Sequence, residues 1–138
     1  MTPDKLFAAF AEERWVSRWL SPSPEIKLNV LRFDFTVGGA YRFAYEIPGG
    51  DPVIVHGVYS SIEAPRKIVF SWIIEPPDEH AGILSEVTVL ISPDGDGTEL
   101  LIRHEKLLRA DAAKSHSLGW QGALKTLSAL IEIETELT

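Results

Sequence analysis

His104 and Glu105 are adjacent residues of the types that bind catalytic metals or move protons. The helix of zinc proteases needs a second histidine four residues after the first, and this chain has Leu108 there. The pair also falls on a predicted strand, so we expect no metal at this point. On that strand His104 shares a face with Leu100 and Ile102. Its polar tip either orients a ligand or bonds a backbone carbonyl or a neighbouring side chain.

Asp94, Asp96 and Glu105 fall at the spacing of a calcium-binding loop. That loop requires glycine at its sixth position, where this chain has Glu99. Gly95 permits positive φ, and aspartates favour turns through their own side-chain hydrogen bonds. The segment is therefore predicted to be a hairpin turn.

His56 precedes Gly57 on another predicted strand. It faces either the interior or solvent, depending on whether the glycine marks a bulge that resets the alternation. A partnership of His56 with His104, Glu86 or Asp34 would supply the general acid and base of a cyclase or hydrolase. Nothing in the sequence pairs these residues, so the catalytic residues stay undefined.

The sequence also lacks two common signatures of catalysis and cofactor binding. Ser115-His116-Ser117 lies near the start of a predicted helix, where serine caps more often than it attacks, and Gly-x-Ser-x-Gly is absent. No glycine-rich loop has phosphate-binding spacing. We therefore expect no cofactor.

Two helices and then a run of strands must position these residues. Thr2 suits an N-cap and Pro3 the first helical position, and a second short helix through Trp15 and Trp19 should end before the segment Ser21-Pro22-Ser23-Pro24. From Lys27 to Glu105 the pattern has period two, which is typical of half-buried strands. The first strand is predicted to turn Leu31, Phe33, Phe35 and Val37 to one face, and five more to follow at 41–46, 53–62, 67–74, 85–92 and 98–106.

A helical period returns from about Asp111 to Glu136. The sheet must cover one face, and only this helix is long enough to do so, so we expect an α+β domain whose curved antiparallel sheet of about six strands wraps it. Gly119 and Gly122 are predicted to pack closely against the sheet. The apolar stripe of the helix is predicted to contain Leu118, Ala123, Leu127, Leu130 and Ile131.

An apolar pocket is expected between sheet and helix, unless its aromatic side chains fill the space. Trp72 and Trp120 are read either as core or as pocket wall. The candidates for lining the pocket are Phe35, Tyr41, Phe43, His56, Trp72, Leu100, His104, Trp120 and Leu124.

Composition limits the partners. The net charge of −7 offers no electrostatic footprint for nucleic acid. The absence of cysteine rules out a disulfide and a thiolate site. The first twenty residues are interrupted by charges and no stretch has the length of a membrane span, so a cytoplasmic location with no membrane partner is expected.

The chain resembles the bacterial proteins similar to the C-terminal domain of the activator of the 90-kDa heat-shock-protein ATPase, within the START-like, or SRPBCC, superfamily. The resemblance is carried by five segments, "RWVSRWLSP", "FDFTVGGAYRF", "HGVYSSIEAPRKIVFSW", "GDGTELLIRHE" and "GWQGALKTLSALIE". It implies one START-like domain over residues 1–138, with the helix-grip, birch-pollen-allergen-like fold and a cavity between sheet and last helix.

Most members of the superfamily bind small hydrophobic molecules, and some are cyclases or hydrolases. The resemblance therefore implies a noncatalytic binder of a small hydrophobic molecule, with an enzyme on such a molecule as the alternative and a stress-related protein-interaction module as the second. The family usually opens with a strand that lies beside the last strand, whereas this chain begins with the helix. We therefore expect an exposed edge near Thr98 to His104, and a homodimer formed through it.

Overall fold

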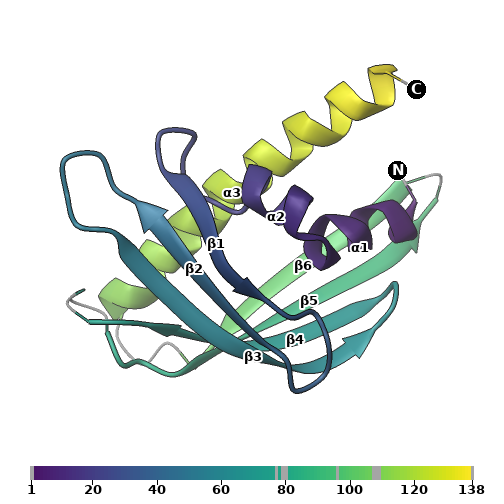
Figure 1. The fold of residues 1–138 in the computed structure, drawn as a ribbon. Helices are drawn as coiled ribbons and strands as arrows, with labels where there is room; N and C mark the ends of the chain where they lie inside the picture. Colours follow the sequence, from purple (N-terminus) through teal and green to yellow (C-terminus); the bar gives the residue numbers. More distant parts are fainter. Residues whose placement is uncertain (1, 77, 79–80, 96, 107–109, 138) are drawn as a thin grey trace.

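Two short helices precede an antiparallel sheet, and one long helix follows it (Figure 1). The computed structural model describes residues 2–76, 78, 81–95, 97–106 and 110–137, with side chains as far as Leu130. The helices are α1 (Pro3–Ala11), α2 (Glu13–Trp19) and α3 (Ala110–Leu137). The strands are β1 (Lys27–Phe33), β2 (Ala40–Glu46), β3 (Val53–Glu63), β4 (Lys67–Ile74), β5 (Ser85–Asp94) and β6 (Gly97–Glu105).

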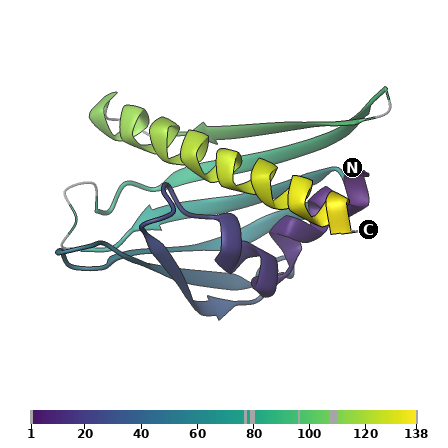
Figure 2. The same ribbon diagram turned by 90° about the horizontal axis from the view of Figure 1, so that it is seen from above.

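Every strand pairs antiparallel with the next one in sequence, giving one six-stranded sheet in the order β1-β2-β3-β4-β5-β6. The sheet curves, and α3 runs across its concave side (Figures 1 and 2). The predicted α+β helix-grip architecture is thereby confirmed. Among the described residues, β1 and β6 are the two edges of the sheet.

The helix pair is fixed at its start, at its centre and at its end. The Thr2 hydroxyl accepts the Lys5 backbone N–H at 3.3 Å, as an N-cap should. Trp19 is fully buried, and its indole Nε1–H donates to the Ala9 carbonyl at 2.8 Å, which joins the two helices. The helix α2 ends at Trp19 ahead of the prolines and contacts both β1 and α3.

The first strand differs from its prediction. A bulge between Val30 and Arg32 shifts the register with β2, so the interior face of β1 changes from the even-numbered Leu28 and Val30 to the odd-numbered Phe33. Leu31 is 52% exposed, and Val37, which lies beyond the strand, is 65% exposed. The alternation of apolar and polar residues along a strand cannot reveal a bulge, because a bulge is a feature of how that strand pairs with its neighbour.

Two predictions about α3 also needed correction. Leu118 is 58% exposed and lies off the buried stripe, whereas Ala123 and Leu127 are buried as predicted; the Ile131 side chain lies outside the described part. Gly122 packs against the loop after α2 and not against the sheet, since a Cβ built there would meet the Pro22 carbonyl oxygen at 1.9 Å.

Aromatic rings fill one half of the space between sheet and helices. The ring centroids lie 4.7 Å apart for Tyr41 and Phe43, and 4.9 Å apart for Phe35 and Tyr59. Burial raises the pKa of the Tyr41 hydroxyl, which donates to the Ser71 carbonyl at 2.5 Å. This half of the interior is a close-packed core, made of Phe33, Phe35, Tyr41, Phe43, Tyr59 and Phe70.

Candidate functional site

The other half of the interior contains a cavity of about 220 Å³ between the sheet and the first half of α3. Three strands, the loop after α2 and α3 supply most of its walls. The lining side chains are mainly aliphatic and aromatic, with polar groups from a few residues. They are Leu20, Ser21, Pro22, Tyr45, Ile47, Val53, Val55, Trp72, Ile74, Asp78, Ser115, His116, Gly119, Trp120 and Ala123.

Two polar wall residues have partners that explain their orientation. The Ser21 hydroxyl lies 2.5 Å from the Ile26 carbonyl and 3.0 Å from the Ser23 carbonyl, so it closes its own loop. His116 Nδ1 lies 2.8 Å from the Ala112 carbonyl, which can only accept, so Nδ1 carries the hydrogen. The cavity therefore presents an oriented imidazole on an otherwise largely apolar wall.

A chain of hydrogen bonds fixes the indole of Trp120. Its Nε1–H donates to His104 Nδ1 at 3.0 Å, so that nitrogen must be unprotonated. His104 Nε2 then carries the hydrogen and donates to the Ser85 hydroxyl at 2.7 Å, which in turn donates to the Trp72 carbonyl at 2.9 Å. Every donor in this series of hydrogen bonds meets an acceptor only while His104 is neutral.

The surroundings of His104 favour that neutral form. Burial of the ring is the main cause that lowers the pKa of His104 to about 3, and the charge that His116 can carry nearby is the second cause. The two imidazole rings stand edge to face with centroids 5.0 Å apart. His104 is thus a positioning residue that holds Trp120 from behind the cavity wall, and it is not itself among the lining residues.

Trp72 forms the wall opposite α3, and its indole hydrogen has no acceptor in the described part of the chain. The residue is 8% exposed, and Nε1 is the one buried side-chain polar atom without a partner among the described residues. Its ring stands among Trp120, His104 and His116, at centroid distances of 5.9, 5.7 and 6.3 Å. An unpaired buried donor is costly, so Trp72 is a group to which an acceptor could be supplied.

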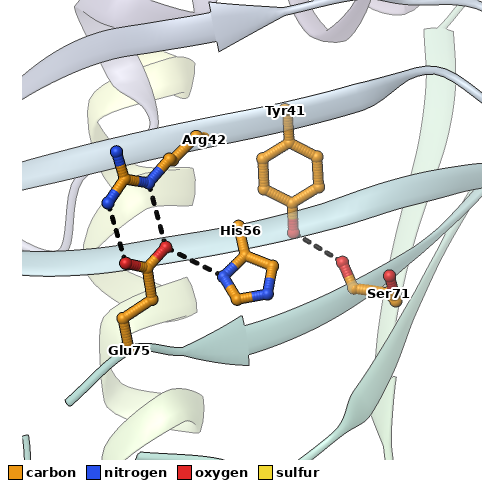
Figure 3. Close-up of polar contacts among 5 residues, drawn as sticks. All are labelled: Tyr41, Arg42, His56, Ser71 and Glu75. Atoms are coloured by element: carbon orange, nitrogen blue, oxygen red, sulfur yellow. Dashed lines mark hydrogen bonds and ion pairs between the residues drawn. The ribbon is translucent and has the colours of Figure 1, made fainter.

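His56 lies on the opposite, outer face of the sheet. Its neighbour Val55 lines the cavity, and alternation along β3 directs His56 away from it. The Glu75 carboxylate accepts hydrogen bonds from Arg42 at 2.8 and 3.0 Å and lies 2.9 Å from His56 Nδ1. Figure 3 shows the three residues of this cluster together. Hydrogen bonding from Arg42, and then from His56, lowers the pKa of Glu75. This outer cluster ties the end of β4 to β2 and β3.

The nine predicted pocket candidates separate into five groups. Trp72 and Trp120 line the cavity. Tyr41 and Phe43 are buried in the aromatic half of the core, and His56 lies on the outer face. His104 stands behind Trp120. The remaining three are partly buried and pack against the core, and they are Phe35, Leu100 and Leu124.

The prediction missed His116 and Asp78, both of which line the cavity. His116 was considered only as part of a serine motif. It precedes Trp120 by four residues, and residues four apart lie on the same face of a helix. That spacing was the signal that could have located it. Asp78 follows the strand β4 in a segment with no regular pattern, so no sequence signal indicated its position.

Within the described ranges, no group of three or more His, Asp or Glu side chains is arranged to hold a metal ion. Over the same residues, no helix is both long enough and apolar enough to span a membrane.

A curved sheet gripping a long C-terminal helix, with a cavity between them, defines the helix-grip class to which START-like proteins belong. The family model described as "Activator of Hsp90 ATPase homolog 1-like protein" matches residues 1–132, and the chain belongs to that family. A comparison with curated proteins returned no match.

Solved structures of similar proteins agree in fold. The AHSA1 protein of Silicibacter pomeroyi is 25% identical with a TM-score of 0.83, covering 97% of this chain and 92% of its own. A protein of Chromobacterium violaceum is 26% identical with a TM-score of 0.79, covering 93% and 88%. A protein of Rhizobium loti is 30% identical with a TM-score of 0.74, covering 92% and 87%.

Proposed function

We propose that this protein binds one small apolar molecule, without transforming it, in the cavity between the sheet and α3. The observation that carries the proposal is the cavity itself, about 220 Å³ in volume and walled mainly by aliphatic and aromatic side chains. An apolar cavity of about 150 Å³ is large enough to bind benzene. A molecule of one or two small rings, or a short branched chain, therefore fits the available space.

The arrangement of polar groups supports binding rather than catalysis. His104 is neutral, has a partner at each ring nitrogen and does not line the cavity, so neither nitrogen is placed to exchange a proton with a ligand. The unpaired Trp72 Nε1–H is suited to a carbonyl or ether oxygen brought by the ligand. A few such groups in an apolar wall orient a ligand without activating it.

The proposal is tested by native mass spectrometry of the chain purified from cells without organic solvent, followed by identification of any retained compound. We expect a 1:1 adduct in the wild type. Ala123 is 3% exposed and lines the cavity, so Ala123→Leu should fill part of the space and remove the adduct. Ala129→Leu, on an exposed position of the same helix, should keep it. An adduct that survives Ala123→Leu would place the compound elsewhere and contradict the proposal.

One observation favours a second candidate, an enzyme of the cyclase or hydrolase type. Asp78 and His116 are both titratable and both line the cavity, and such a pair supplies a general acid and base. Under this alternative the retained compound is converted on incubation with fresh protein. The conversion should be lost in His116→Gln while the adduct remains. Absence of any conversion by the wild type leaves simple binding as the function.

A further inference from the structure

We propose that β6 is a self-complementary edge strand through which two copies of this chain pair, antiparallel, about a two-fold axis at Leu101. In Figure 2, β6 is the outermost strand on its side of the sheet. It pairs with β5 alone among the described strands. Backbone N–H and C=O groups on its free side therefore have the geometry to accept another strand. This inference is independent of what the cavity binds.

The two edges of the sheet differ in how well they resist such pairing. Proteins protect an edge by bulges, lysine and proline. The strand β1 has a bulge between Val30 and Arg32, and it begins with Lys27. In contrast, β6 pairs with β5 in one unbroken register from Glu105 to Gly97, with neither lysine nor proline in the strand. The β6 edge is therefore long and regular, and the charged side chains that it carries, Glu99, Arg103 and Glu105, are of both signs.

The order of side chains on β6 then selects the partner and the register. When two copies run antiparallel with Leu101 opposite itself, Glu99 of each copy lies opposite Arg103 of the other. The outer face of the joined sheet would then show two opposite-charge pairs flanking a pair of leucines. Leu101 is 44% exposed in the single chain, and pairing covers it.

The inner face agrees with the same register. Leu100 of one copy lies opposite Ile102 of the other, so apolar residues meet on the concave side. A shift of the axis by one residue to Ile102 sets Glu99 opposite Glu105 and Leu101 opposite Arg103. Like charges and mismatched pairs would then oppose association. The axis at Leu101 is therefore favoured by both faces of the strand.

The side chains that must form the new pairs are accessible. Arg103 is 54% exposed, and its contact with Glu105 on the same strand, at 3.9 Å, is a weak one. Glu99 is also exposed. Cross-strand charge pairs add modestly to affinity, whereas like charges in their place weaken it. Charge therefore sets the register, and the backbone hydrogen bonds provide most of the attraction.

Sedimentation equilibrium of the full chain with charge-swapped variants tests the proposal. The wild type should approach twice the 15.3 kDa chain mass as concentration rises. Glu99→Arg or Arg103→Glu alone sets like charges opposite each other at both symmetry-related sites, which should weaken dimerisation by about tenfold. The double variant, Glu99→Arg with Arg103→Glu, should restore it. Arg32→Glu on β1 changes the net charge by the same amount as Arg103→Glu and should leave dimerisation unchanged.

A cysteine placed on the axis gives a second measurement. The chain contains no cysteine. Leu101→Cys would bring two thiols together within the Cα separation that a disulfide spans, so mild oxidation should yield a covalent dimer. Val58→Cys, at an equally exposed position on the central strand β3, should stay monomeric. A wild type that is monomeric at all concentrations, a double variant without rescue, or equal cross-linking at both positions would overturn the proposal.

Discussion

His104 shows how a single side chain can shape a cavity without lining it. Its two ring nitrogens connect Trp120 to Ser85, and Ser85 to the Trp72 carbonyl. These bonds join two walls of the cavity through one residue. A protonated His104 would present a hydrogen to the Trp120 indole N–H, and the two donors would repel each other. The neutral state is thus part of the architecture of the site.

The pH dependence of stability follows from this arrangement. The pKa of His104 is about 3 in the folded chain, below its ordinary 6.5, so between these values the unfolded chain binds the additional proton. His104 therefore stabilises the fold fully above pH 6.5, and this contribution falls by up to about 1.4 kcal/mol per unit as pH decreases.

Replacing His104 by glutamine should remove that slope. Urea unfolding at pH 7.5, 5.5 and 4.5 should show His104→Gln destabilised by about 1–3 kcal/mol at pH 7.5, because two hydrogen bonds are lost, with the difference from wild type shrinking as pH falls. His56→Gln, on the outer face, is the control. Parallel pH slopes for His104→Gln and wild type would show that His104 is not held neutral.

At the scale of elements, the position of α3 depends on a close backbone approach. Gly122 and Gly119 both face Pro22, in the loop after α2. A Cβ on Gly122 would meet the Pro22 carbonyl oxygen at 1.9 Å, whereas a Cβ on Gly119 would meet the nearest Pro22 atom at an ordinary 3.6 Å. The same loop closes one side of the cavity, so the seating of the helix and the shape of the site are linked.

The two glycines provide a matched pair of substitutions. Gly122→Ala should destabilise the chain by about 1–3 kcal/mol, since backbone must shift to admit the methyl group. Gly119→Ala should be neutral or stabilising by up to about 1 kcal/mol, because alanine favours the helix and the space permits it. Thermal or urea unfolding of both variants measures this. Equal effects would mean that the helix does not seat on Pro22.

The elements themselves were predictable because their signals are local. Period-two segments between glycine and proline turns placed the strands, and the residues before proline placed the end of α2. The bulge at Val30 and Arg32 was not predictable, since it depends on pairing with β2. The direction in which the His56 side chain points was also not predictable. It depends on how β3 pairs with β2, and not on Gly57 alone.

The site was less predictable than the fold. Alternation identified inward-facing aromatics, but only three-dimensional packing decides whether such rings fill a space or line it. Tyr41 and Phe43 fill it, while Trp72 and Trp120 line it. Side chains contributed by loops, such as Asp78, have no period to reveal them. The spacing of four residues between His116 and Trp120 was a usable signal that both side chains lie on the same face of the helix and line the cavity.

For the whole molecule, the interior is divided along the sheet. The aromatic half and the helix pair α1–α2 form a dense core, and the cavity occupies the half beneath the beginning of α3. Filling one half with rings stabilises the sheet, so the fold tolerates a cavity in the other half. Trp72 and Trp120 line the cavity, Trp19 on α2 is buried in the core, and Trp15 on the same helix packs beside Arg14 and Arg18.

The most direct test of the central claim is a titration of the ¹⁵N-labelled chain with toluene, followed through the four indole N–H signals. Toluene is apolar and small enough for the 220 Å³ cavity. The account predicts saturable shifts of the Trp72 and Trp120 signals, with those of Trp15 and Trp19 unchanged, and loss of the shifts in Ala123→Leu. Signals of Trp72 and Trp120 that stay fixed at saturating toluene would show that the cavity does not admit an apolar ligand, and would contradict the proposed function.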